Sequence, residues 1–217
     1  MKKWLGLIVI SILLVFGGCS DTTSRTKGIY MLLDSSGTYS NELKGAQAII
    51  NYLLGTLEPG DSFGIAKIDS ASFSEKDIVA KMTFDKRPSV TNKQKRLFKH
   101  RVDEFVASVK KGSAFTDITG GILQAAEYLH ESGAGKKYIL IFSDLKEDLK
   151  KGHIRDFPIQ VSGCDVVALN VTKLRSDNID PREYYDRVEK WKERVEAGGG
   201  SWRLVNDLNR VEEILDS

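Results

Sequence analysis

The sequence predicts an α/β fold in which a doubly wound, mostly parallel six-stranded sheet carries one antiparallel edge strand. Apolar runs at 29–33, 138–142 and 165–171 are continuous rather than alternating, a pattern typical of parallel strands that are buried on both faces. Amphipathic helical stretches separate most of the strands, which indicates helices on both faces of the sheet. The connector between the strand-like stretches 62–68 and 78–84 is too short to contain a helix, so this pair is predicted to be antiparallel.

Three helices are predicted between the first strand and residue 132. Apolar residues recur at helical spacing over 42–57, and Glu58-Pro59-Gly60 ends that helix. The second helix, 92–111, keeps its apolar residues on one face and stops at Gly112. The third, 118–132, follows a short loop and carries Ile118, Ile122, Ala125, Ala126 and Leu129 on its apolar face.

The last third of the chain continues the alternation of strands and helices. A weak helical pattern lies between Lys146 and Phe157. Asp180-Pro181-Arg182-Glu183 is a helix start with Asp as the N-cap, Pro at the first helical position and Glu at the third. A short strand is predicted at 201–205. Asn206 then caps a final helix with an apolar face of Leu208, Val211, Ile214 and Leu215.

Composition indicates one ordinary globular domain behind a targeting segment. The 217 residues are 41% hydrophobic and 29% charged, which suits a chain with a sizeable core. The formal charge of +2 comes from Lys2 and Lys3, so the rest of the chain is balanced and a nucleic-acid partner is not expected. Residues 1–18 join a positive start to a short apolar run and small residues, as secretory signals do. We expect a lipidated Cys19 with a short polar linker over 19–27, and the folded domain over 28–217.

The end of the signal segment resembles a bacterial lipoprotein lipobox. It reads Leu14-Val15-Phe16-Gly17-Gly18-Cys19, although Phe16 departs from the usual aliphatic residue and leaves ordinary secretion as an alternative. The resemblance implies a signal peptide removed before Cys19 and acyl chains that hold the exported protein at the cell membrane. Ser20 favours the outer membrane in a host that has one. Cys164 then has no partner for a disulfide and is expected to be a buried apolar residue.

Five oxygen-bearing side chains stand at predicted strand ends or at a helix start. Asp34, Ser36 and Thr38 follow the first strand, Thr116 precedes a helix, and Asp144 ends the strand at 138–142. Ligands of doubly wound sheets bind beyond the carboxyl ends of the strands, where the strand order reverses. Carboxylates and hydroxyls suit Mg²⁺ or Mn²⁺, with Ca²⁺ as a further option, and the lack of His or Cys here argues against Zn²⁺.

These residues resemble the von Willebrand factor A-type (VWA) domain and its metal-ion-dependent adhesion site, MIDAS. That site has the order Asp-x-Ser-x-Ser, then Thr, then Asp, and Asp34-Ser35-Ser36-Gly37-Thr38, Thr116 and Asp144 match it, with Thr38 in place of Ser. The resemblance spans 27–217. It implies a Rossmann-like fold and a metal whose open position accepts an Asp or Glu carboxylate from a partner protein.

Other interpretations remain open. Each motif alone is also typical of a capped turn or a helix N-cap. Leu33-Asp34-Ser35-Ser36-Gly37-Thr38 is similar to the nucleophile loop of haloacid-dehalogenase-type phosphatases, with Asp34 as nucleophile and Asp144 and Asp148 as the late acidic motif. Ser36, however, replaces the carboxylic acid that would protonate the leaving group. A scaffold of the same fold without metal is the third interpretation.

The preferred hypothesis is a lipid-anchored, extracytoplasmic binding module for adhesion in a bacterial cell envelope, not an enzyme. Nothing near Ser36 supplies the general base that a nucleophile needs. The loop 172–179 is predicted to end on the metal edge, and its Lys173 and Arg175 are expected to flank the metal and favour an acidic ligand. The alternative for that loop is an ordinary solvated segment. His100, His130 and His153 lack ligand spacing and are expected at the surface.

Overall fold

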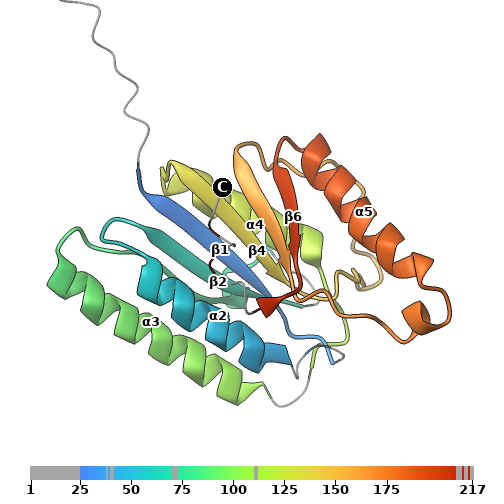
Figure 1. Ribbon diagram of the computed structural model, residues 1–217, viewed down its shortest axis with the longest axis horizontal. Helices are drawn as coiled ribbons and strands as arrows, with labels where there is room; N and C mark the ends of the chain where they lie inside the picture. Colours follow the sequence, from blue (N-terminus) through green and yellow to red (C-terminus); the bar gives the residue numbers. More distant parts are fainter. Residues whose placement is uncertain are drawn as a thin grey trace, which may run out of the picture.

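The computed structural model describes residues 25–37, 39, 42–69, 73–109, 112–208, 212 and 215. Its strands form one six-stranded sheet with the order β3-β2-β1-β4-β5-β6 (Figure 1). All neighbours are parallel except β2 and β3, and β3 lies at the edge. The predicted sheet and its antiparallel edge strand are confirmed. The strands are β1 Lys27–Asp34, β2 Ser62–Ile68, β3 Ile78–Thr83, β4 Lys136–Phe142, β5 Cys164–Leu169 and β6 Ser201–Val205.

The strand order reverses beside β1. From β1 the chain proceeds through β2 to β3 on one side, then returns to β4 on the other side and continues to β5 and β6. Parallel pairing of β1 with β4 sets Leu33 opposite Phe142, so both strands end at the same edge of the sheet. The crevice beyond that edge is where doubly wound folds bind ligands.

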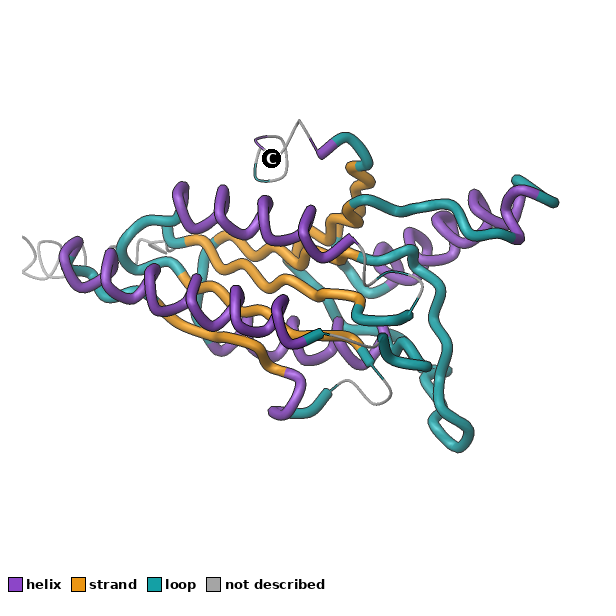
Figure 2. Tube along the Cα trace, turned by 90° about the horizontal axis from the view of Figure 1, so that it is seen from below, coloured by secondary structure: helices purple, strands orange, loops and turns teal. Residues whose placement is uncertain are grey.

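Alternate residues of each central strand enter two separate hydrophobic cores. On β1, Ile29, Met31 and Leu33 pack on the face covered by α2 and α3, while Tyr30 and Leu32 pack on the face covered by α4 and α5. This explains the continuous apolar runs, because every side chain of a strand covered on both faces is buried. Helices accordingly lie on both sides of the sheet (Figure 2).

Four of the predicted helices are present with small differences in their ends. The helices are α2 Leu43–Thr56, α3 Pro88–Ser108, α4 Ile118–Glu131 and α5 Arg182–Ala197. Helix α3 begins before the predicted residue 92, because Pro88 sits in its first turn, where a proline costs no hydrogen bond. The predicted N-cap of α5 is wrong by one residue. Pro181 is the N-cap, while the carboxylate of Asp180 accepts from the backbone N–H of Arg182 (3.1 Å).

The weak helical pattern between Lys146 and Phe157 is not a helix. Residues 143–163 form an irregular crossover that joins β4 to β5. Its backbone is drawn away from helical geometry by an isolated antiparallel bridge between Thr116 and Asp148. Its apolar side chains Leu145, Ile159 and Val161 are buried in the α4 and α5 core, so this segment covers the sheet as a helix would elsewhere.

Several predictions fall on residues that the structure does not describe. Residues 1–24 contain the predicted signal segment and Cys19, and the predicted last helix lies mostly beyond residue 208. Of its apolar residues, Leu208 and Leu215 pack against the α2 and α3 core. Within the described part of the chain, no helix has both the length and the apolar character needed to cross a bilayer.

Candidate metal centre

Two loops meet by backbone pairing at the carboxyl edge of β1. Ser36 and Ser113 form an isolated parallel bridge, in which Ser113 N donates to Ser35 O (2.7 Å) and Gly37 N donates to Ser113 O (3.1 Å). Gly112 permits this approach, because a Cβ on it would lie 2.2 Å from the Gly37 backbone. The loop that leads to Thr116 is therefore fastened beside Ser36.

Asp34 ends β1 and is fully buried. One carboxylate oxygen accepts from Ser36 N (2.8 Å), and the other accepts from Ser143 Oγ (2.6 Å). Burial raises the pKa of Asp34, while the hydrogen bonds from Ser143 and Ser36 oppose that rise. The carboxylate thus links the end of β1 to Ser36 and to Ser143, the residue that follows β4.

Thr116 and Asp117 precede α4 and make different contacts. Asp117 is the N-cap: its carboxylate accepts from Gly120 N (2.8 Å) and pairs with Arg155 (2.8 Å). Thr116 does not cap the helix. Its backbone pairs in both directions with Asp148, and the residue lines a cavity at the edge of the sheet. The cap interpretation therefore applies to Asp117 and leaves Thr116 as a candidate ligand.

Asp144 follows β4 and has 3% of its surface exposed. Its carboxylate accepts from Lys146 N (2.9 Å), a local turn that places the buried Leu145 in the left-handed region (φ 64°). Burial raises the pKa of Asp144, the hydrogen bond from Lys146 lowers it, and the charge of Asp34 raises it. The two carboxylates therefore repel each other electrostatically.

One cavity of about 270 Å³ collects most of these groups. Ser36, Thr116 and Asp144 come together there, as the sequence predicts. The full lining is Ser36, Gly37, Ser113, Ala114, Thr116, Asp144, Lys146, Asp148 and Leu174. Asp34 lies behind the Ser36 loop and does not line the cavity. Thr38 lies outside the described residues.

Lys173 and Arg175, which were predicted to flank the metal, do not line the cavity. Lys173 and Arg175 are exposed, and the residue of their loop that lines the cavity is Leu174 between them. The cation on the cavity wall is Lys146. The flanking role of Lys173 and Arg175 stays a prediction.

The donor set fits a hard cation. Every candidate ligand on the wall is a hydroxyl or a carboxylate, which Mg²⁺, Mn²⁺ and Ca²⁺ prefer. Asp34 and Asp144 are two buried acids whose charged forms burial disfavours, and a cation held nearby would offset that cost. Among the described residues, no group of three or more His, Cys, Asp or Glu could hold a metal, so such a centre depends on hydroxyls and water.

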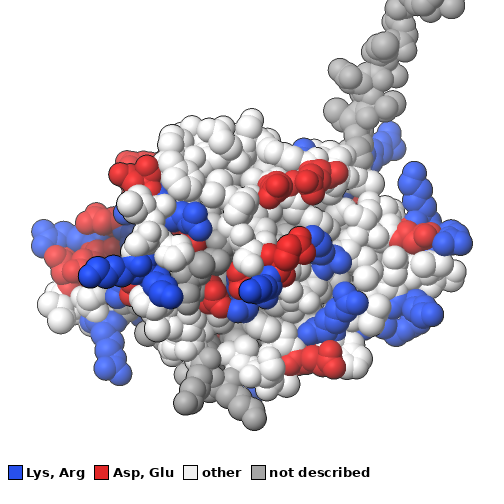
Figure 3. All heavy atoms as spheres, turned by 180° about the vertical axis from the view of Figure 1, so that it is seen from behind, with Lys and Arg blue, Asp and Glu red and all other residues white. Residues whose placement is uncertain are grey.

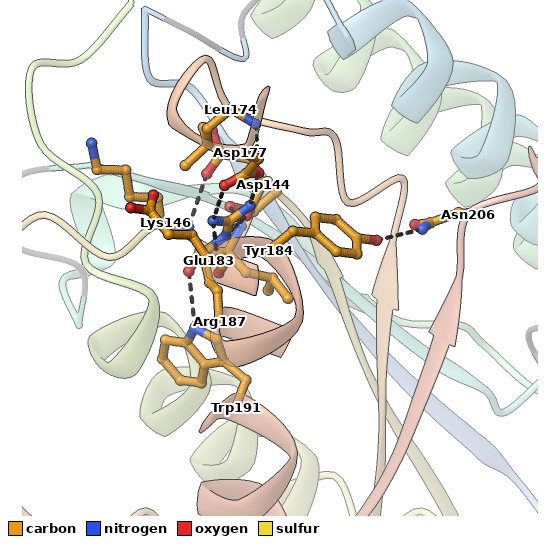
Figure 4. Close-up of polar contacts among 11 residues, drawn as sticks. Asp144, Lys146, Leu174, Asp177, Glu183, Tyr184, Arg187, Trp191 and Asn206 are labelled. Atoms are coloured by element: carbon orange, nitrogen blue, oxygen red, sulfur yellow. Dashed lines mark hydrogen bonds and ion pairs between the residues drawn. The ribbon is translucent and has the colours of Figure 1, made fainter. Parts of the chain in front are cut away.

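The structure adds residues that sequence reasoning missed. Ser143 donates to Asp34 and could have been noticed, since it directly precedes Asp144 at a strand end. Asp148 was considered only for the phosphatase motif, yet its backbone holds Thr116 and it lines the cavity. Arg187 on α5 donates from Nε to the carbonyl of Asp144 (2.9 Å; Figure 4), and no local signal pointed to it.

The three histidines and Cys164 lie where ordinary surface and core residues lie. His100, His130 and His153 are exposed, and Cys164 is a free, buried thiol at the start of β5. On the face shown in Figure 3, Lys and Arg side chains lie beside Asp and Glu, in keeping with the balanced charge of the chain.

Comparison with known proteins supports the fold. A von Willebrand factor type A structure from Catenulispora acidiphila matches with a TM-score of 0.54 and 12% identity, over 88% of this chain and 41% of that chain. An aerotolerance-related membrane protein from Bacteroides fragilis, solved with multiple mutations to serines, gives 0.48 and 16%, over 87% and 96%. The manganese-loaded TRAP protein of Plasmodium vivax gives 0.49 and 12%, over 88% and 72%. No protein-family model and no curated protein sequence matches the chain. The first similarity shows a VWA-type fold and the fold alone.

Proposed function

We propose that this protein is a lipid-anchored, extracytoplasmic binding module that uses a Mg²⁺ or Mn²⁺ site to bind a carboxylate on a partner protein. The observation that carries the proposal is the cavity at the reversal of strand order, into which three separate loops bring Ser36, Thr116 and Asp144. A bound cation would supply an open position for an acidic side chain. Lys146 on the cavity wall would add attraction for the same group.

The role of binding rather than catalysis is supported by the state of Asp34. A phosphatase nucleophile must reach its substrate, whereas Asp34 is fully buried and both of its oxygens accept hydrogen bonds. Ser36 stands where the acid of that mechanism is needed, and a hydroxyl is a poor proton donor near neutral pH. One observation favours the phosphatase: Asp148 lines the same cavity as Asp144.

The first experiment titrates the protein with Mg²⁺, Mn²⁺ and Ca²⁺ and follows its thermal unfolding. A cation at one hundred times its Kd is expected to raise the free energy of unfolding by about 2.7 kcal/mol. Asp144→Asn and Asp34→Asn are expected to abolish the effect, whereas Asp156→Asn, an exposed acid outside the cavity, should keep it. If saturating cation leaves the wild-type transition unchanged, the metal site is refuted.

The second experiment tests the anchor and the partner. The full chain and its Cys19→Ala variant are expressed in a bacterial host, and the membrane fraction is compared. The wild type is expected in that fraction and the variant in the soluble exported fraction. Partner capture from solubilised membranes should be lost with a chelator and restored by Mn²⁺. Capture that ignores the chelator would count against a metal-bridged carboxylate.

A hydrolysis assay on the same purified protein tests the phosphatase alternative. The phosphatase hypothesis expects Mg²⁺-dependent hydrolysis of a phosphate monoester that disappears in Asp34→Asn. The binding hypothesis expects no hydrolysis above that of the variant, together with the metal-dependent stabilisation described above. Robust wild-type turnover would replace the proposal.

A further inference from the structure

Helix α5 holds the loop of the candidate ligand Asp144 through two successive carbonyl groups. Arg187 Nε donates to Asp144 O (2.9 Å), and Trp191 Nε1 donates to Leu145 O (3.0 Å). The two donors are four residues apart, so they lie on one face of α5. Leu145 is buried with φ of 64°, a left-handed conformation that is unfavourable for a residue with a Cβ atom. The loop needs outside contacts to keep this shape, and α5 supplies them.

The guanidinium of Arg187 also holds a second loop. Its Nη2 and Nη1 donate to the two oxygens of Asp177 (2.7 and 3.1 Å). The side chain of Asp177 is fully buried, and that of Arg187 is 13% exposed. Asp177 in turn accepts from the backbone N–H of Leu174 (2.8 Å), which lines the cavity. One side chain therefore connects the candidate ligand Asp144 to the loop of Leu174, another residue of the cavity wall (Figure 4).

We propose that Arg187, Trp191 and Asp177, named here the α5 clamp, position the Asp144 carboxylate for the cation. The inference rests on the proposed function, because it concerns the same site. Fixing both carbonyls of a two-residue segment fixes the direction of the side chain it carries, and the turn from Asp144 to Lys146 N depends on the same backbone. Residues that orient metal ligands in this way commonly change metal affinity by about 10- to 100-fold when replaced.

Arg187 is suited to this role in a way that lysine is not. Its planar fork engages both oxygens of Asp177 while Nε points at a carbonyl from another element. An ammonium in its place can pair with Asp177 but cannot keep both contacts in one geometry. The two substitutions Arg187→Lys and Arg187→Met therefore separate the ion pair from the contact to Asp144.

The experiment measures the Mn²⁺ affinity of the full-length protein in mild detergent by calorimetry, beside its metal-free unfolding midpoint. Arg187→Met is expected to raise the Kd for Mn²⁺ by about tenfold or more. Arg187→Lys should recover most of the metal-free stability but not the affinity. The matched control is Arg182→Met on the same helix, whose ion pair with Asp180 is 85% exposed on the arginine side, and its Kd should stay within about twofold of wild type.

Trp191→Phe keeps the test decisive if the arginine variants fail to fold. It preserves a buried aromatic ring and removes only the N–H that holds Leu145 O, and a several-fold rise in Kd is expected. A clamp that serves stability alone would lower the unfolding midpoints of these variants while the folded protein keeps wild-type affinity. That result overturns the inference and leaves the proposed function standing. If the wild type itself binds no Mn²⁺, the proposed function fails and this inference with it.

Discussion

Gly112 shows how closely two loops approach each other at the candidate metal centre. Replacing it with alanine would place a Cβ 2.2 Å from the Gly37 backbone and 2.5 Å from Ser36 C, so the Ser113 loop must move away from the Ser36 loop. We expect Gly112→Ala to destabilise the protein by about 1–3 kcal/mol and to weaken Mn²⁺ binding. Chemical denaturation and calorimetry measure the two effects. Gly55→Ala, on α2 with open space around it, should leave the affinity unchanged, and equal behaviour of the two variants would contradict the prediction.

Cys164 gives a prediction with a defined pH dependence. Burial raises the pKa of its thiol to about 11, so the native protein holds an inert thiol at pH 8. In a Cys19→Ala chain, we expect no alkylation by iodoacetamide until the protein unfolds. The thiol ionises at a lower pH in the unfolded chain than in the native protein. The free energy of unfolding therefore falls as the pH rises from the ordinary thiol range toward 11. Rapid native alkylation at pH 8 would contradict the buried position.

The candidate metal ligands that the sequence predicts and the structure describes share one property: each stands within two residues of a strand end or a helix start. Asp34, Thr116 and Asp144 could be proposed together because the carboxyl ends of parallel strands and the starts of the helices that follow them lie at one edge of the sheet. Arg187 was not found, because its partner Asp144 is distant in sequence and the contact exists only after α5 has packed. Asp148 could be noticed as an acid, but its backbone bridge to Thr116 could not, since such pairing leaves no side-chain pattern.

At the scale of elements, Arg155 ties the irregular crossover to the start of α4. Its guanidinium pairs with Asp117, whose side chain is 1% exposed and also caps the helix. We expect Arg155→Met to lower the free energy of unfolding by about 3 kcal/mol, because a buried carboxylate loses its counterion. Denaturant titration of Arg155→Met measures this change. Arg87→Met, whose ion pair with Asp85 is exposed, should change stability little, and a comparable loss there would contradict the argument.

The elements that sequence predicted well carry a periodic pattern along their whole length. Helices α2 and α4 match their predicted ranges closely, because the apolar residues that recur at helical spacing in the sequence are the ones buried in the structure. The crossover 143–163 was misjudged, because its apolar residues Leu145, Ile159 and Val161 cover the sheet without any helical period. The path of this crossover depends on tertiary contacts such as the ion pair between Arg155 and Asp117. Short-range sequence patterns do not predict contacts between residues so far apart in the chain.

At the scale of the whole molecule, the sheet topology followed from few rules. Continuous apolar strands joined by helices give parallel neighbours, and one short connector gives the antiparallel edge. The position of β1 at the centre, next to β4, was a condition of the site hypothesis and is now observed. The lipid anchor and the partner belong to parts or states of the protein beyond the described residues, and they stay predictions.

The central position of β1 also governs the order in which the molecule can be completed. β1 is the first strand to leave the ribosome, yet one of its edges pairs with β4, which is synthesised much later. Until β4 and Ser143 have emerged, Asp34 lacks the hydrogen bond from the Ser143 hydroxyl, and the middle of the future sheet presents an open edge. The cavity also needs Asp144, Asp148 and Leu174, so it cannot be complete before residue 174 has been synthesised. Capture of a cation at the proposed site would therefore require a chain that extends at least to Leu174, and a chain that stalls earlier would lack part of the cavity wall.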